Sequence, residues 1–203
     1  MRHLSWIAAW LTLLCAGAVS ANMAPPIPLP DRPAAAIKLP AGFKLQVFAQ
    51  LPGAGADYFK GPRFMTFDSN GHLYVSTGLD NKVYMLPDQD GDGAADAIVL
   101  VADKLNAPQG LAFVDGKLLV ANQDSVVQLE RGADGQWPAG NIQPLISDLA
   151  TGGHTLKSLK LGPDDHLYLN IGSSCNVCIE NDPTRATIER YTKEGRAAGA
   201  LVT

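Results

Sequence analysis

Three stretches of this sequence share one layout, and their spacing constrains the fold more than any other feature. Each has alternating apolar residues, a tight turn rich in Asp, Asn and Gly, and a second alternating apolar run, which is the pattern of a β-hairpin. The turns fall at Gly71, Gly116 and Asp165. They recur every roughly 45 to 49 residues, the period expected for four-stranded blades of a β-propeller.

Further apolar runs supply candidates for the remaining strands, at residues 83–86, 98–101, 126–129, 142–146 and 187–191. No amphipathic helix is evident after the leader. We therefore expect an all-β chain in which residues 37–203 form about three blades of a β-propeller that has six blades when complete. The last residues, AAGALVT, show no closing strand, so we expect an N-terminal fragment of the ring. A β-sandwich with similarly spaced hairpins is the alternative.

The N-terminus predicts export. Arg2 and His3 precede an apolar run that ends in small residues, and residues 1–21 therefore fit a secretory signal peptide. The run is shorter than the roughly 20 residues that span a bilayer, so we expect no membrane span and a periplasmic or secreted protein. Residues 22–36 form a Pro-rich linker. The formal net charge of −4 offers no basic surface for nucleic acid.

Polar residues stand at matching positions of the three repeats, just before the first strand of each hairpin. Aligned on their apolar strands, the repeats place there Arg63, Gln109 and Lys157, and three residues earlier Lys60, Asn106 and His154. The first strand of each propeller blade lines the central channel, so side chains at its entry converge on one mouth. We therefore predict a binding site there, with ordinary solvated loop residues as the alternative.

Among these residues, His154 is the candidate for catalysis. His72 and His166 share one position after the turn of their repeats, which a structural role explains, whereas His154 has no histidine counterpart. Imidazole titrates near neutral pH and can take a proton from a sugar hydroxyl. A structural histidine is the alternative interpretation.

The stretch from Gly152 to Gly195, GGHTLKSLKLGPDDHLYLNIGSSCNVCIENDPTRATIERYTKEG, resembles the motif region of the pyrroloquinoline quinone (PQQ)-dependent sugar dehydrogenases, especially the sorbosone and pyranose dehydrogenase-like members. The segments GPRFMTFDSNGHLYVST and APQGLAFVDGKLLVAN are similar to the preceding blades of that family. The resemblance runs from about Leu39 onward.

The resemblance implies a quinoprotein oxidoreductase that oxidises an aldose- or sorbosone-type sugar by hydride transfer to PQQ. It implies that His154 is the general base. Arg63, Gln109 and Lys157 are then candidates for binding the cofactor, and an external acceptor such as a cytochrome or a quinone takes the electrons. The family's own quinone-binding segment and its metal-coordinating loop lie beyond residue 203, so we expect this stretch alone to be inactive.

Cys175 and Cys178 are the only cysteines after the leader. A Cys-x-x-Cys pair in an exported protein can be a local disulfide, a redox pair or half of a metal site. No second Cys or His pair is spaced for zinc, and Ile179 rather than His follows the second cysteine. We expect a short structural disulfide that braces the loop after the His154 hairpin.

The segment DQDGDG resembles the start of a calcium loop, in which alternate carboxylates face one centre and glycine permits the sharp turn. It contributes Asp88, Asp90 and Asp92, and Asp96 follows nearby. Position twelve is Val99 rather than Glu, and the flanks read as strands, so this is not an EF-hand. We predict a calcium-binding hairpin loop here, with an acidic turn free of metal as the alternative.

Two other functions fit a propeller. A calcium-dependent lactonase would bring acidic metal ligands to the channel, whereas the predicted channel positions hold Arg, Gln, Lys, Asn and His. The other is a non-catalytic propeller that binds a protein or a glycan.

Overall fold

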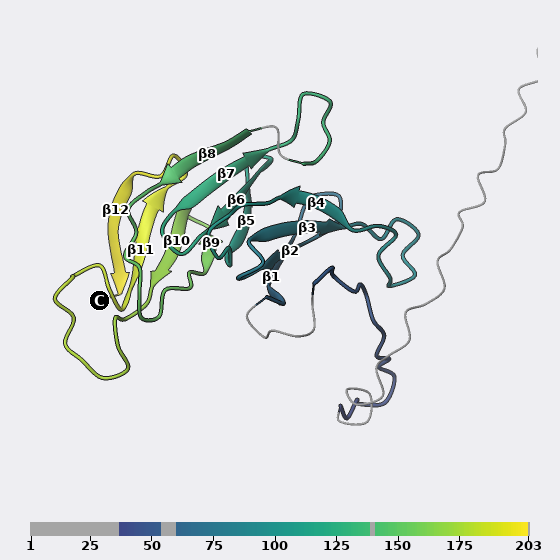
Figure 1. Cartoon of the computed structure of the whole chain (residues 1–203), viewed down its shortest axis with the longest axis horizontal. Coiled ribbons are helices and arrows are strands. Elements are labelled where there is room, and N and C mark those ends of the chain that lie inside the picture. Colours follow the sequence, from purple (N-terminus) through teal and green to yellow (C-terminus); the bar gives the residue numbers. More distant parts are fainter. Residues whose placement is uncertain (1–36, 54–59, 139–140, 203) are drawn as a thin grey trace, which may run out of the picture.

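The structure is a computed structural model that describes residues 37–53, 60–138 and 141–202. Twelve strands form three four-stranded sheets, which follow one another in an arc (Figure 1). The sheets are β1 (Pro62–Phe67), β2 (Leu73–Thr77), β3 (Lys82–Leu86) and β4 (Val99–Ala102); β5 (Leu111–Val114), β6 (Lys117–Ala121), β7 (Val126–Glu130) and β8 (Asn141–Ile146); and β9 (Leu159–Leu161), β10 (His166–Ile171), β11 (Thr187–Thr192) and β12 (Ala197–Val202).

Every sheet is an antiparallel meander in which each strand pairs with its neighbours in sequence. The first strands of the three sheets lie next to one another, since β5 contacts both β1 and β9. This is the arrangement of successive propeller blades, and the predicted all-β propeller architecture with three blades is confirmed. The described residues contain no helix, and so none long and apolar enough to cross a membrane.

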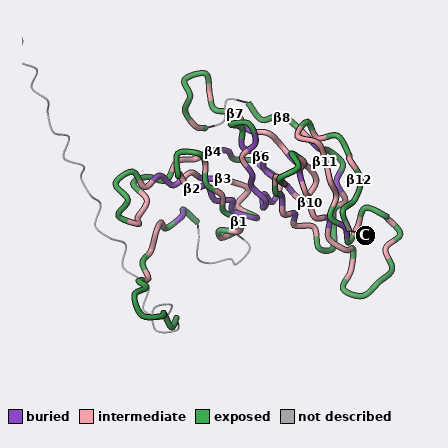
Figure 2. Tube along the Cα trace, turned by 180° about the vertical axis from the view of Figure 1, so that it is seen from behind, coloured by how far each residue is buried: buried purple, intermediate pink, exposed green. Residues whose placement is uncertain are grey.

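The hydrophobic core lies between the sheets, and the middle sheet is covered on both faces by its neighbours. One cluster joins Tyr74 and Val83 of the first sheet to Leu118 of the second, and another joins Leu119 of the second to Leu167 of the third. The inner strands are therefore almost continuously apolar, as strands buried on both faces are, and they form the purple centre of Figure 2.

Main-chain contacts also tie the sheets together. The Ser76 hydroxyl donates to the Gln109 carbonyl at 2.7 Å, and the Gly110 N–H donates to the Lys157 carbonyl at 2.9 Å. A side chain at residue 110 would overlap the backbone of Leu159. The close approach of the second and third sheets therefore requires glycine at that position.

A polar cluster anchors the first sheet to the second. The hydroxyl of buried Tyr74 accepts hydrogen bonds from Trp137 Nε1 at 3.0 Å and Arg131 Nη2 at 2.9 Å. It donates in turn to Asp68 at 3.4 Å. This cluster borders a cavity of about 210 Å³ that the β1–β2 and β5–β6 turns help to line.

The five additional strands predicted from apolar runs are all present, within one or two residues of their expected bounds. One expectation was wrong. The AAGALV segment, which was expected to lack a strand, forms β12 and completes the third sheet. Its small residues give no apolar alternation, and its pairing with β11 comes from main-chain hydrogen bonds after the turn at Gly195. The predicted signal peptide and most of the Pro-rich linker lie outside the described residues.

Candidate functional site

Two loops meet at one end of the third sheet. In an antiparallel meander, the connection from one blade to the next and the loop between the second and third strands leave from the same side. The β8–β9 connection and the β10–β11 loop are therefore neighbours, and the His154 N–H of the first donates to the Ser173 carbonyl of the second at 2.9 Å.

Two glycines permit this contact. A Cβ at residue 153 would lie 2.6 Å from the Ser173 carbonyl oxygen, and a Cβ at residue 172 would overlap the carbonyl oxygen of His154. Gly153 also has a φ of +60°, which disfavours other residues. The Gly-Gly-His and Ile-Gly-Ser sequences thus place the backbone of His154 against the opposite loop.

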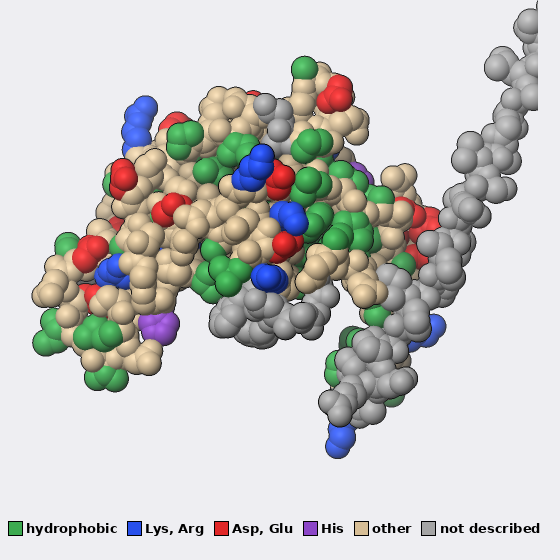
Figure 3. Space-filling model, viewed as in Figure 1, with side chains coloured by type: hydrophobic (Ala, Val, Ile, Leu, Met, Phe, Trp, Pro, Cys, Tyr) green, Lys and Arg blue, Asp and Glu red, His purple; other side chains and the backbone are tan. Residues whose placement is uncertain are grey.

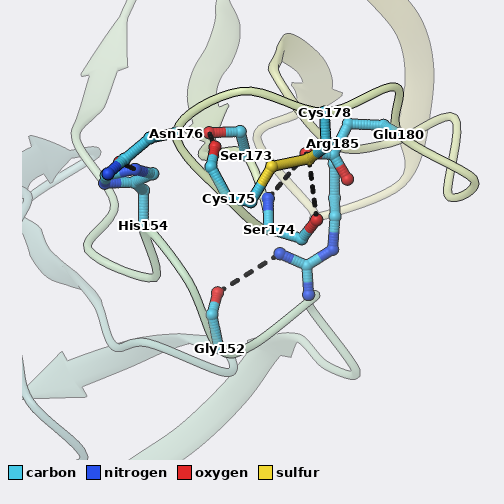
Figure 4. The surroundings of a disulfide bond; sticks show 9 residues. All are labelled: Gly152, His154, Ser173, Ser174, Cys175, Asn176, Cys178, Glu180 and Arg185. Carbon is cyan, nitrogen blue, oxygen red and sulfur yellow. Dashed lines mark hydrogen bonds between the residues drawn. A yellow bond between two sulfur atoms is a disulfide. The ribbon is translucent and has the colours of Figure 1, made fainter.

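The imidazole of His154 is exposed, and among the described residues its hydrogen-bonding side-chain partner is Asn176 (Figure 4). Its Nε2 lies 2.8 Å from Oδ1 of Asn176. Asn176 was not predicted as a site residue. The signal that could have indicated it is its position between the two cysteines, directly beside the loop that carries His154.

The predicted disulfide between Cys175 and Cys178 is present. Ser173 Oγ donates to the Cys175 carbonyl at 2.8 Å, and the Ser174 N–H donates to Glu180 at 2.6 Å. Arg185, from the end of the same loop, donates to the carbonyl oxygens of Gly152 and Thr151. The disulfide therefore closes a loop that is itself fastened to the His154 segment.

Lys157 occupies a different environment from the one expected at a channel mouth. Its side chain is fully buried, and Nζ donates to the carbonyls of Gln123, Ala150 and Thr155 at 2.7, 2.8 and 3.0 Å. Burial, together with the positive charge of Arg185 and against the opposing effect of Asp124, lowers the pKa of Lys157 to about 8. With these three bonds in place, the ammonium has no N–H left for a cofactor.

Gln109 lies two residues before β5, as Lys157 does before β9, whereas Arg63 lies inside β1. Gln109 is buried at 8% exposure, and its Oε1 has no hydrogen-bond partner among the described residues. Arg63 is half-buried at an irregularity of the β1–β2 pairing, and such bulges redirect side chains. The roles of these two residues in cofactor binding stay predictions.

The residues three positions earlier differ from one another. Asn106 is held in a network in which it donates to Asp124 at 2.6 Å and accepts from Gln123 at 2.6 Å. Lys60 is exposed. Of the six predicted positions, His154 therefore combines exposure with a fixed side-chain partner.

The predicted calcium loop connects β3 and β4, at the opposite end of the strands from the His154 loops. The structure brings together three of its four carboxylates, since oxygens of Asp88, Asp90 and Asp96 lie within 4.8 Å of one another. Asp92 is not part of this group, and its carboxylate accepts from the Ala94 N–H at 2.8 Å. Oxygen donors of this kind suit calcium.

Comparison with known protein families shows the family to which the chain belongs. The model of a family described as a domain of unknown function, DUF7133, matches residues 30–196. The chain belongs to the DUF7133 family. No curated protein matches it significantly.

Several solved structures resemble the fold of the DUF7133 chain. The PQQ domain of pyranose dehydrogenase from Coprinopsis cinerea matches with a TM-score of 0.56 and 18% identity, over 64% of this chain and 33% of that one. A calcium structure of a Trichoderma reesei carbohydrate-active enzyme of family AA12 matches with a TM-score of 0.56 and 20% identity, over 70% of this chain and 38% of that one. PQQ-bound aldose sugar dehydrogenase from Streptomyces coelicolor matches with a TM-score of 0.53 and 14% identity, over 70% of this chain and 49% of that one.

The DUF7133 chain thus spans a third to a half of the length of these structures. At such identities the likeness concerns the fold. The expected resemblance to sugar quinoproteins is confirmed at that level.

Proposed function

We propose that this DUF7133 chain forms part of a quinoprotein oxidoreductase that oxidises an aldose- or sorbosone-type sugar, with PQQ as cofactor and His154 as general base. The observation that carries the proposal is the placement of His154. It is an exposed imidazole fixed through both its backbone and its side chain, on a blade scaffold like that of PQQ-binding sugar dehydrogenases.

Oxidation of the sugar requires the removal of a hydride and a proton. Oxidation of a cyclic aldose to a lactone removes a hydride from the anomeric carbon and a proton from its hydroxyl. When bound, PQQ would supply the hydride acceptor. His154 would accept the hydroxyl proton, since a positioned imidazole is suited to this at neutral pH.

The residues present fit part of a PQQ site. PQQ carries three carboxylates and a pyrrole N–H, so it needs cationic donors and one acceptor. Arg63 carries a positive charge near this position, and Gln109 offers a buried acceptor, since its Oε1 has no hydrogen-bond partner in the described part of the chain. Lys157 is already saturated by carbonyl oxygens, so in this proposal it positions the loop around His154 rather than binding the cofactor directly.

A calcium ion held by Asp88, Asp90 and Asp96 would have a structural role. These carboxylates lie in the β3–β4 connection, away from the His154 loops. The ion would fasten this loop and the segment at Gln46, whose amide donates to the Asp92 carbonyl at 3.1 Å.

We further propose that the protein is exported and passes its electrons to an external acceptor such as a cytochrome or a quinone. A leader in residues 1–21 supports export. N-terminal sequencing of the protein from the producing cells should find a mature terminus near Asn22, and an intact Met1 on cytoplasmic protein would contradict export.

The test of the function is PQQ titration of the native-length protein, with dye-linked activity measured on a panel of aldoses and lactones. Saturable PQQ binding with sugar-dependent dye reduction is the expected result. Lactone hydrolysis without PQQ would point to a hydrolase instead, and binding of sugar with neither activity would point to a binding module.

A further inference from the structure

Asn176 occupies a position from which it can control the chemistry of His154. It lies inside the short ring closed by the Cys175–Cys178 disulfide, and its Oδ1 is 2.8 Å from Nε2 of His154 (Figure 4). In the same loop, the Ser173 carbonyl accepts a hydrogen bond from the backbone N–H of His154. The imidazole is thus fixed at its ring and at its main chain by one loop.

The partner determines which ring nitrogen carries the proton. An amide oxygen can only accept, so the nitrogen that faces it must be protonated in the neutral imidazole. Nε2 then carries the hydrogen, and Nδ1 keeps its lone pair. We infer that Asn176 is a positioning residue that holds His154 in the Nε2-protonated tautomer and leaves Nδ1 as the proton acceptor; its catalytic consequence rests on the proposed function.

The surroundings explain why an asparagine in this loop can do so. The disulfide restricts the backbone on both sides of Asn176, and Glu180 accepts the Ser174 N–H within the same loop. Arg185 then ties this loop to the carbonyl of Gly152, two residues before His154. Because these contacts hold the backbone at Asn176, the loop loses little conformational freedom when the amide bonds the imidazole.

The segments packed around His154 also carry charges. Their charged side chains are Asp124, Lys157, Glu180, Asp182 and Arg185. Within the described part of the chain, none of them forms a hydrogen bond or an ion pair with the imidazole. A substitution at residue 176 leaves them all in place, so a change in the titration of His154 reports the partner itself.

The experiment uses protein with ¹⁵N-labelled histidine and without PQQ, followed by NMR over pH 4 to 9. His154→Ala assigns the signal. The wild type should show the Nε2-protonated tautomer. Asn176→Asp places a carboxylate beside the ring, which favours the charged imidazolium, and should move the titration midpoint of His154 up by about 0.5 to 1 pH unit. Asn176→Ala should give a mixture of tautomers.

The matched control is Val177→Ala. Val177 lies in the same disulfide ring and is 94% exposed. The β10–β11 loop that contains this ring carries hydrophobic side chains on the surface, at the lower left of Figure 3. This variant should behave as the wild type does. If Asn176→Ala kept the wild-type tautomer, or if Asn176→Asp left the midpoint unchanged, the inference would be overturned.

Kinetics of the native-length holoenzyme add a second readout. Asn176→Ala should lower kcat roughly tenfold or more with little change in KM, because an orienting partner acts on the proton-transfer step. Asn176→Asp should recover most of kcat at a higher pH. If the wild type failed to bind PQQ but the NMR shifts were as expected, the proposed function would fail and the positioning of His154 by Asn176 would stand.

Discussion

The buried ammonium of Lys157 predicts a pH dependence of folding stability that is opposite to that of most lysines. Its pKa in the folded protein is about 8, whereas a lysine in an unfolded chain titrates near 10.4. Between these values the unfolded chain holds a proton that the folded chain has lost. The free energy of unfolding therefore rises with pH in this window, because alkaline conditions remove the cost of burying the charge.

The size of the effect follows from the two pKa values. Each pH unit inside the window changes the free energy of unfolding by up to about 1.4 kcal/mol. Since the side chain is fully buried, solvent does not screen the effect. From pH 7 to pH 9.5 we expect a gain of about 2 kcal/mol from this group. The range stops at 9.5 because tyrosines begin to ionise above it.

Urea unfolding followed by the fluorescence of Trp137 measures this gain at a series of pH values. The control is Lys157→Met, which has no titrating amine and should lose the rise. If that variant does not fold, Lys157→Arg serves, because a guanidinium stays charged throughout the range. Equal pH dependence in the wild type and the substituted protein would refute the assignment of the rise to Lys157.

Three further outcomes follow from the structure. Tyr74→Phe removes the acceptor of the Trp137 indole N–H, and urea unfolding should show a loss of about 1 to 3 kcal/mol; an unchanged stability would mean that this bond contributes nothing. Gly172→Ala forces a Cβ onto the His154 carbonyl, and should cost about 1 to 3 kcal/mol and weaken the imidazole contact, as NMR would detect. Calcium should raise the Tm of the wild type by several degrees but not that of Asp88→Asn, and equal shifts would exclude this loop as the calcium site.

The blade architecture could be predicted from the sequence because each hairpin is a local pattern of apolar alternation and turn residues. The strand β12 could not, because Ala and Gly carry no such pattern and its pairing depends on β11. The disulfide could be predicted for the same local reason, because the two cysteines are three residues apart and the sequence after the leader has no other cysteine.

The candidate site could be predicted from the sequence only in part. His154 stood out because it breaks the repeat. Asn176 was marked only by its position between the two cysteines, and its contact with His154 joins two separate loops. The alignment of the repeats placed Lys157 and Gln109 two residues before β9 and β5, but such an alignment does not give the direction of a side chain. The carbonyls that surround the Lys157 ammonium come from separate segments, so its burial could be found only in the folded chain.

The proposed transfer of the sugar proton to His154 can be measured separately from substrate binding and product release. Native-length protein loaded with PQQ is mixed with an aldose, and the absorbance of the bound quinone is followed through a single turnover. His154→Ala should bind PQQ as tightly as the wild type and reduce it about 10²- to 10⁴-fold more slowly. Quinone reduction at a near wild-type rate in the His154→Ala protein would show that His154 is not the general base.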